Sequence, residues 1–234
     1  MTRPKVPISK GSSTERRRQL RRSVEQTQGF AGGSSSDFLE QAQFHYPKLV
    51  LSPMVKIVGI GGSLRPASHS QVALNLAAQR VETIGAKVEI LDLRQMHLPF
   101  CNGEDEYPGY PDVERLRNAV KQADGLILAT PEYHGSVSGV LKNALDLMGF
   151  EHLDSKVAGL ISVLGGQPNS NALNDLRLIM RWVHAWVIPE QIAIGQVWKA
   201  FDPDGKILDE KLSQRFDQFA ESLVENTRKL RGVL

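Results

Sequence analysis

Hydrophobic residues are arranged in two alternating patterns from residue 54 onward. Short aliphatic runs, which are typical of buried strands, alternate with longer segments in which apolar residues recur every three or four positions, as in amphipathic helices. The short runs predict five strands, at about residues 55–60, 87–91, 124–130, 156–163 and 187–194. Few charges interrupt these runs, so we expect the strands to be buried on both faces.

The longer segments predict five helices, at about residues 69–84, 112–122, 138–149, 170–184 and 209–230. In the first of them Val72, Leu76 and Val81 lie on one apolar face, and Gly85 is well placed to end the helix. Strands that alternate with helices indicate βα units around a parallel sheet. The predicted fold class is therefore α/β, a five-stranded parallel sheet with helices on both faces, in one domain spanning residues 54–234.

Residues 1–53 have a different composition. They carry nine Lys or Arg against four Asp or Glu, and they include an arginine cluster at 16–22 and a Gly/Ser stretch at 32–36. Such a composition favours disorder, so we expect a basic extension ahead of the domain. Three specific interpretations stay open: a tail that contacts anionic partners, an organelle-targeting segment such as a plastid transit segment, or sequence upstream of a native start at Met54. The plainer alternative is a mobile extension without catalytic consequence.

Charge and composition exclude several classes of function. The whole chain has a net charge of +2, but residues 1–53 contribute +5, which leaves −3 for the domain and argues against a nucleic-acid-binding surface there. No apolar run reaches the roughly 18 residues that a membrane span needs. The single cysteine excludes an internal disulfide, and the histidines lack metal-ligand spacing, so we expect no metal and a reducing, cytoplasmic location unless the extension directs the chain elsewhere.

Ligands of an open parallel sheet bind beyond the carboxyl ends of its strands. After the first predicted strand, the segment GGSLRPASHS combines glycines, hydroxyls and one arginine at the start of a helix, where backbone N–H groups can hold an anion. Ser63, Ser68, Ser70 and Arg65 would suit a terminal phosphate. In the plainer alternative, Ser68 only caps the helix. Neither the Gly-x-Gly-x-x-Gly nor the Walker A pattern is completed here.

Two further loops carry candidate residues. After the third strand, TPEYHGSVSG places an aromatic ring beside glycines and accessible backbone groups, which suits a flat heteroaromatic ligand. After the fourth strand, LGGQPNSN offers Gly165, Gly166 and Gln167 for a close approach. The alternative for this third loop is a turn capped by Asn169 or Ser170.

Two motifs resemble the NADPH-dependent FMN reductase family, which includes chromate, quinone and azo-dye reductases. They are GSLR followed by serines, and PEYHGS leading into GVLKNALD about 70 residues later. The resemblance covers residues 55 to about 230. It implies a flavodoxin-like fold, bound FMN and NADPH or NADH as reductant. It also implies small-molecule electron acceptors and a homodimer or homotetramer.

By this resemblance, Ser63, Arg65, Ser68 and Ser70 hold the FMN phosphate. The ribityl chain and the isoalloxazine ring would be bordered by Pro131, Glu132, Tyr133, His134, Gly135 and Ser136, with Gly165, Gly166 and Gln167 from the third loop. The chemistry would belong to FMN, with no catalytic side chain. Two positions depart from the usual family pattern: His134 replaces Asn, which puts the hydrogen bonding around the flavin in doubt, and Ser138 replaces Pro.

The function implied is a ping-pong oxidoreductase, in which bound FMN takes a hydride from the nicotinamide and passes electrons to flavins, quinones, azo dyes or similar acceptors. Two alternatives stay open. One is a flavodoxin-like carrier that passes single electrons between proteins, and the other is a non-catalytic flavin-binding module.

Overall fold

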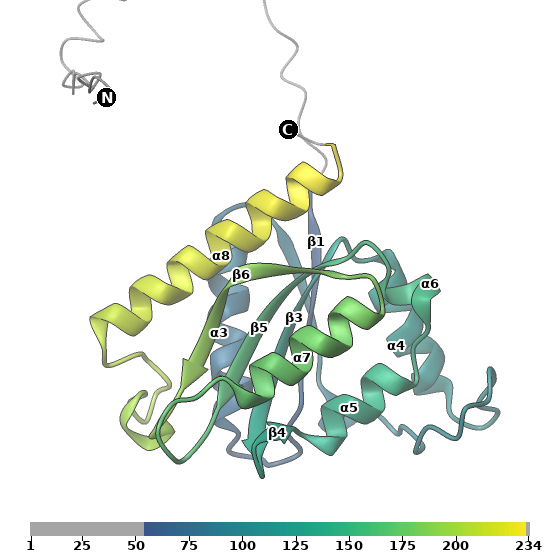
Figure 1. The fold of residues 1–234 in the computed structure, drawn as a ribbon, viewed down its shortest axis with the longest axis horizontal. Coiled ribbons are helices and arrows are strands. Elements are labelled where there is room, and N and C mark those ends of the chain that lie inside the picture. Colours follow the sequence, from purple (N-terminus) through teal and green to yellow (C-terminus); the bar gives the residue numbers. More distant parts are fainter. Residues whose placement is uncertain (1–53, 233–234) are drawn as a thin grey trace, which may run out of the picture. The chain divides into compact units, whose positions relative to one another are not determined.

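A parallel sheet of five strands forms the centre of the domain (Figure 1). The computed structural model describes residues 54–232, so the expected extension 1–53 lies outside the described residues. In the order β2-β1-β3-β5-β6, the strands are Lys87–Leu91, Lys56–Gly61, Gly125–Tyr133, Val157–Val163 and Trp186–Ile194. The prediction of a five-stranded parallel sheet is confirmed.

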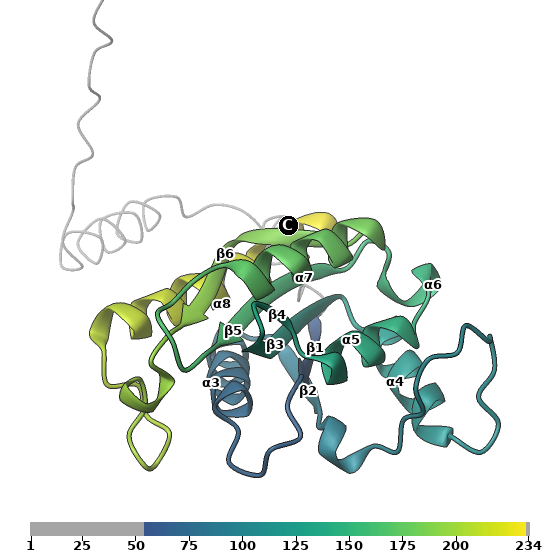
Figure 2. The same cartoon turned by 60° about the horizontal axis from the view of Figure 1, so that its bottom comes forward.

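Helices cover both faces of the sheet. α3 (His69–Thr83) and α8 (Glu210–Leu230) lie on one face, while α4 (Pro111–Gln122), α5 (Gly139–Asp146) and α7 (Asn171–Trp182) lie on the other (Figures 1 and 2). Each layer encloses its own hydrophobic core. The interior strand β5 has every residue buried, which is the burial that its uninterrupted apolar run predicts.

The helix expected at 138–149 is shorter in the structure, and a second helix that was not expected follows it. α5 ends at Asp146, and the single-turn helix α6 (Phe150–Leu153) follows after a break at Gly149. The buried His152 ring accepts a hydrogen bond at Nδ1 from the Gly149 N–H, at 3.0 Å, and so caps the new helix. The apolar pattern continues through the break, which is why the pattern alone does not reveal it.

The remaining elements are short. β4 (Ser136–Val137) pairs antiparallel with the end of β3, and the 3₁₀ helices η1 (Leu93–Gln95) and η2 (Val197–Lys199) follow β2 and β6. None of the three was expected from the hydrophobic pattern. Across residues 54–232, the structure has no helix with both the length and the apolar character that crossing a membrane requires.

The chain reverses its winding direction between β1 and β3. β1 leads to α3 on one face and β3 leads to α5 on the other, although the two strands are neighbours in the sheet. The loops that follow them therefore diverge and leave a crevice beyond the carboxyl ends of the strands. The candidate site lies at this switch point.

Candidate functional site

The loop from β1 to α3 passes close to β3 and α5. The Gly62 N–H donates to the Ala129 carbonyl at 2.7 Å, and the Gly62 carbonyl accepts from the Ser138 hydroxyl at 2.6 Å. A Cβ on Gly62 would lie only 2.7 Å from Leu141 Cβ. Glycine is thus required at this position, and the loop that follows is held firmly against the neighbouring strand.

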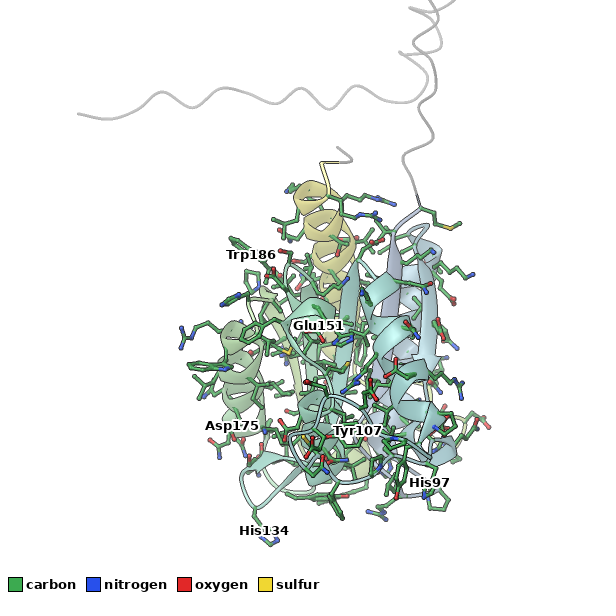
Figure 3. The ribbon with its side chains drawn as sticks, turned by 90° about the vertical axis from the view of Figure 1, so that its right-hand side faces the viewer. His97, Tyr107, His134, Glu151, Asp175 and Trp186 are labelled. Atoms are coloured by element: carbon green, nitrogen blue, oxygen red, sulfur yellow. The ribbon has the colours of Figure 1, made fainter. Side chains whose placement is uncertain are left out.

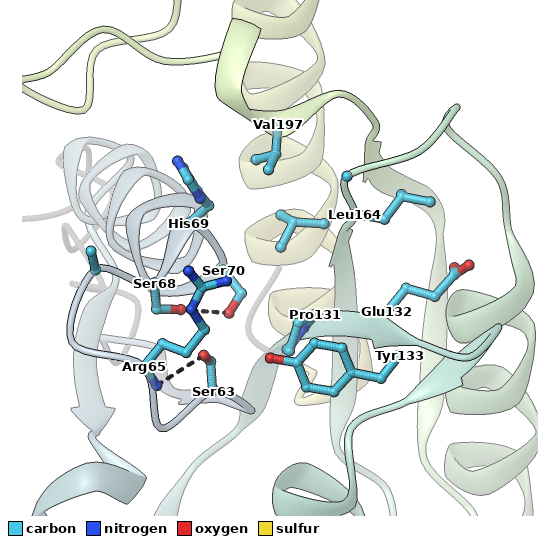
Figure 4. Close-up of a pocket in the computed structure, with 13 residues that line it drawn as sticks. Ser63, Arg65, Ser68, His69, Ser70, Pro131, Glu132, Tyr133, Leu164 and Val197 are labelled. Atoms are coloured by element: carbon cyan, nitrogen blue, oxygen red, sulfur yellow. Dashed lines mark hydrogen bonds between the residues drawn. The ribbon is translucent and has the colours of Figure 1, made fainter.

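Three buried serines line the start of α3. Ser68 Oγ lies 2.9 Å from Ser70 Oγ and also accepts from the Gln71 N–H at 3.2 Å, while Ser63 Oγ accepts from the Arg65 N–H at 3.3 Å (Figure 4). Ser68 therefore caps the helix, as the plainer alternative supposed. Capping uses the oxygen as an acceptor, so it is compatible with a ligand-binding role for the hydroxyl proton.

The start of α3 is also suited to an anion. The N–H groups of His69 and Ser70 occupy the first two helical positions, where a helix offers no carbonyl partner. The Arg65 side chain extends from the loop toward these groups (Figure 4). Unpaired N–H groups, the positive end of the helix dipole and a guanidinium together favour a bound phosphate or a similar anion.

The second loop is a β-hairpin that the sequence patterns did not reveal. β3 and β4 pair Tyr133 with Ser136, and the two residues between them, His134 and Gly135, have φ values of 52° and 78°. Two consecutive residues with positive φ form a type I′ turn, for which Asn-Gly is the preferred sequence. Histidine also adopts this conformation more readily than most residues. Residue 134 is thus a turn position, and its imidazole lies at the exposed hairpin tip (Figure 3).

The other departure from the family pattern, Ser138, also has a structural role. Its hydroxyl accepts from the Leu141 N–H at 3.2 Å and so caps α5, and it donates to Gly62. Its own N–H donates to Thr130 Oγ1 at 3.0 Å. A proline could make neither the cap nor the N–H bond, so the serine here links the first loop, β3 and α5.

Two side chains of the hairpin are bonded to α7 and to the loop that precedes it. The Glu132 carboxylate accepts from Asn169 Nδ2 at 2.8 Å and from the Ala172 N–H at 3.4 Å, at the start of α7. Ser136 Oγ donates to the Asp175 carboxylate at 2.6 Å. The second and third candidate loops are therefore joined to each other, and Glu132 is engaged as an acceptor.

The third loop is also joined to the turn after β6. The Leu164 N–H donates to the Ile194 carbonyl at 2.9 Å, and the Gln196 N–H donates to the Gly166 carbonyl at 2.8 Å. Gln196 has a φ of 45°, a conformation that is uncommon outside glycine. The turn at 195–198 thus belongs to the same structural unit as the glycine loop.

One open pocket brings parts of these segments together (Figure 4). It has about 420 Å³ of empty space, which includes space open to solvent. Eight of the predicted site residues line it: Ser63, Arg65, Ser68, Ser70, Pro131, Glu132, Tyr133 and Gly165. The other five, which do not line it, are His134, Gly135, Ser136, Gly166 and Gln167.

Five further residues line the pocket and were not predicted: Ala67, His69, Val163, Leu164 and Val197. Ala67 and His69 lie within the predicted first loop, so their position in the sequence was enough to predict that they line the site. Val197 follows the last strand at the same edge of the sheet, and the rule for ligand sites in parallel sheets could have indicated it. Among residues 54–232, no group of three or more His, Cys, Asp or Glu is arranged to hold a metal ion.

Comparison with known proteins identifies relatives of this chain. The sequence profile of the NADPH-dependent FMN reductase family matches residues 55–199. An NAD(P)H-dependent FMN reductase of Pseudomonas aeruginosa is 36% identical over 190 residues, which cover 78% of this chain and 100% of that protein. An NADPH azoreductase of a Bacillus species is 36% identical over 141 residues, covering 60% of this chain and 76% of that protein.

Among solved structures, the flavoenzyme FerB of Paracoccus denitrificans, an NAD(P)H:acceptor oxidoreductase, superposes with a TM-score of 0.63. The alignment covers 75% of this chain and 98% of that one at 23% identity, so it shows a shared fold. Because the family profile matches more than half of the chain and a relative is 36% identical over its whole length, the chain belongs to the NADPH-dependent FMN reductase family.

Proposed function

We propose that the domain is an NAD(P)H-dependent oxidoreductase that holds FMN in the pocket between the β1–α3 loop and the β3–β4 hairpin. The observation that carries the proposal is that a set of anion donors and a hairpin with an aromatic residue meet in one pocket at the switch point of the sheet. The Pseudomonas relative, which the chain covers entirely, is named as an FMN reductase and supports the choice of cofactor.

The residues fit the cofactor. Ser63, Ser68 and Ser70 with the first N–H groups of α3 and the Arg65 guanidinium match the several acceptor oxygens of a terminal phosphate. At the other side of the pocket, Tyr133 and Gly165 offer an aromatic side chain and an unhindered backbone for the isoalloxazine ring. When bound, FMN supplies the two-electron redox chemistry.

The chain contributes binding and orientation. Glu132, the one carboxylate that lines the pocket, accepts hydrogen bonds from Asn169 and Ala172, so we assign it the role of fixing two loops and not that of a general base. The pocket is open, and we infer that the reduced nicotinamide and the electron acceptor occupy the same exposed face in turn, as a ping-pong reaction requires. Flavins, quinones and azo dyes are the proposed acceptors, the last because one relative is named as an azoreductase.

We also propose that the protein assembles as a homodimer or homotetramer and acts in a reducing compartment such as the cytoplasm. An exposed apolar pair on the described surface supports assembly: Leu178 and Trp182 lie one turn apart on α7 and are 60% and 69% exposed. Sedimentation equilibrium tests this proposal directly. A monomer at micromolar concentration would contradict it.

Anaerobic reduction tests the proposed reaction. The protein, reconstituted with FMN and freed of excess cofactor, should lose its flavin absorbance on addition of NADPH or NADH and regain it when a quinone is added. A flavin that neither nucleotide bleaches, but that dithionite does, would contradict the reductase and favour an electron carrier or a non-catalytic flavin-binding module.

A further inference from the structure

Trp198 stands at the rim of the pocket, on η2 immediately after β6. Its neighbour Val197 lines the pocket, where Figure 4 shows it on the turn beside Leu164. The indole lies against the glycine loop: a Cβ on Gly165 would be 3.3 Å from Trp198 Cζ3. Because Gly165 also lines the pocket, one edge of the indole ring borders the residues that form the mouth.

The backbone beneath Trp198 is held in a defined conformation. The Val197 N–H donates to the Leu164 carbonyl at 3.3 Å, and the Gln196 N–H donates to Gly166. Gly195 packs so closely on Pro168 that no Cβ would fit. A strained φ at Gln196 is maintained only because these contacts hold it. The position of the indole is therefore set by the fold.

Most of the indole surface is nevertheless open to solvent, with 60% of the residue exposed. Single exposed aromatic residues are common on protein surfaces and by themselves indicate nothing. Trp186 is equally exposed, at 61%, but the two tryptophans differ in position. Trp186 begins β6 at the opposite end of the nine-residue strand, roughly 25–30 Å away at about 3.3 Å per residue (Figure 3).

We propose that the indole of Trp198 is one wall of the site where the electron acceptor binds, and that it favours planar aromatic acceptors over compact non-aromatic ones. The proposal rests on the function proposed above and adds a residue that determines its substrate class. A flat apolar ring at the mouth of an open pocket can stack against a quinone or an azo dye. A hydrated inorganic anion gains nothing from that surface.

The test compares two acceptors with the FMN-loaded full-length protein. Menadione is a planar quinone, and ferricyanide is a compact anion that needs no stacking. Aromatic pairs contribute enough to predict that Trp198→Ala lowers the ratio of kcat/KM for menadione to kcat/KM for ferricyanide by about 3- to 10-fold. Trp198→Phe should keep the ratio within about 2-fold of the wild-type value, because it retains an aromatic face.

Trp186→Ala is the matched control, since it removes an equally exposed indole from the far end of the same strand. Its acceptor ratio should equal that of the wild type. If Trp198→Ala leaves the ratio unchanged, or if Trp186→Ala lowers it equally, the proposal is wrong. When NADPH still bleaches the flavin of Trp198→Ala and the ratio is unchanged, only this proposal fails. When NADPH bleaches no form of the protein, the reductase function itself fails.

A binding measurement decides the matter should Trp198→Ala lose its fold or its flavin. The chain has three tryptophans, so the double variant W182F/W186F retains Trp198 as its only indole, and W182F/W198F retains Trp186. Menadione added to the oxidised, FMN-loaded protein should quench the Trp198 emission saturably, whereas the Trp186 emission should show only linear collisional quenching. Identical linear quenching in both variants would overturn the proposal.

Discussion

The bond from Glu132 to the loop before α7 should be a principal link between the second and third candidate loops, and replacing Glu132 by Ala tests it. The substitution removes a 2.8 Å hydrogen bond from Asn169 and a negative charge at the start of α7. Hydrogen bonds to charged groups contribute about 1.5–3 kcal/mol, and a charge at a helix N-terminus about 0.3–1 kcal/mol. The second bond, to the Ala172 N–H, is long at 3.4 Å and adds little.

Glu132 is half-buried, and water can replace part of what is lost. We therefore expect Glu132→Ala to lower the free energy of unfolding by about 2 kcal/mol, which for a domain of this size lowers Tm by roughly 4–8 °C. Thermal unfolding of the flavin-free protein, followed by circular dichroism, measures this directly. Glu132→Gln should unfold at a temperature between those of the wild type and Glu132→Ala, because its amide oxygen still accepts from Asn169.

The matched control is Glu221→Ala, which removes an exposed carboxylate from α8 and should change the free energy of unfolding by no more than about 0.5 kcal/mol. If Glu132→Ala and Glu221→Ala unfold at the same temperature, the carboxylate does not join the two loops. The structural role assigned to it would then be wrong.

Three further predictions concern the anion site, the glycine loop and a buried histidine. Replacing Arg65 and Ser68 by Ala should weaken FMN retention, and an unchanged flavin content after dialysis would contradict the phosphate assignment. Gly62→Ala should lower the free energy of unfolding by about 1–3 kcal/mol because its Cβ would meet Leu141. Gly166→Ala should be nearly neutral, because a Cβ there has no atom within 4 Å. Equal unfolding temperatures for the two variants would refute this prediction. Burial lowers the pKa of His152 from its usual 6.5, so the unfolded chain binds more protons and the free energy of unfolding should fall as pH drops below about 6.5. His152→Asn should flatten this pH dependence, which urea titrations at several pH values measure. An unaltered slope would contradict the role assigned to His152.

The sequence was sufficient to predict the sheet and its main helices, because strands buried on both faces appear as uninterrupted apolar runs. The β3 strand illustrates this: its run from Gly125 has the burial that the pattern implies. The hairpin that follows could not be found in that way. β4 has only two residues, and its turn is marked by the φ preferences of His134 and Gly135, not by hydrophobicity.

The site was predictable where motifs are local. Ser63, Arg65, Ser68 and Ser70 lie in one loop, and all four line the pocket. Val197 follows the last strand at the carboxyl edge of the sheet, which made it a candidate, but only the strand order, with β6 beside β5, brings it to this pocket. His134 lies within a local motif, yet the turn places its side chain at the hairpin tip and not among the residues that line the pocket (Figure 3).

The relative affinity for FMN and riboflavin tests the central claim most directly, because the two flavins differ only in the phosphate. Two or more charged hydrogen bonds and the N-terminus of α3 should together contribute about 3–5 kcal/mol, so FMN should bind at least about 100-fold more tightly. Titration calorimetry of the flavin-free protein gives both dissociation constants. A 100-fold or greater preference for FMN is the predicted result, and equal affinity for the two flavins would contradict the phosphate site at Ser63, Arg65, Ser68 and Ser70.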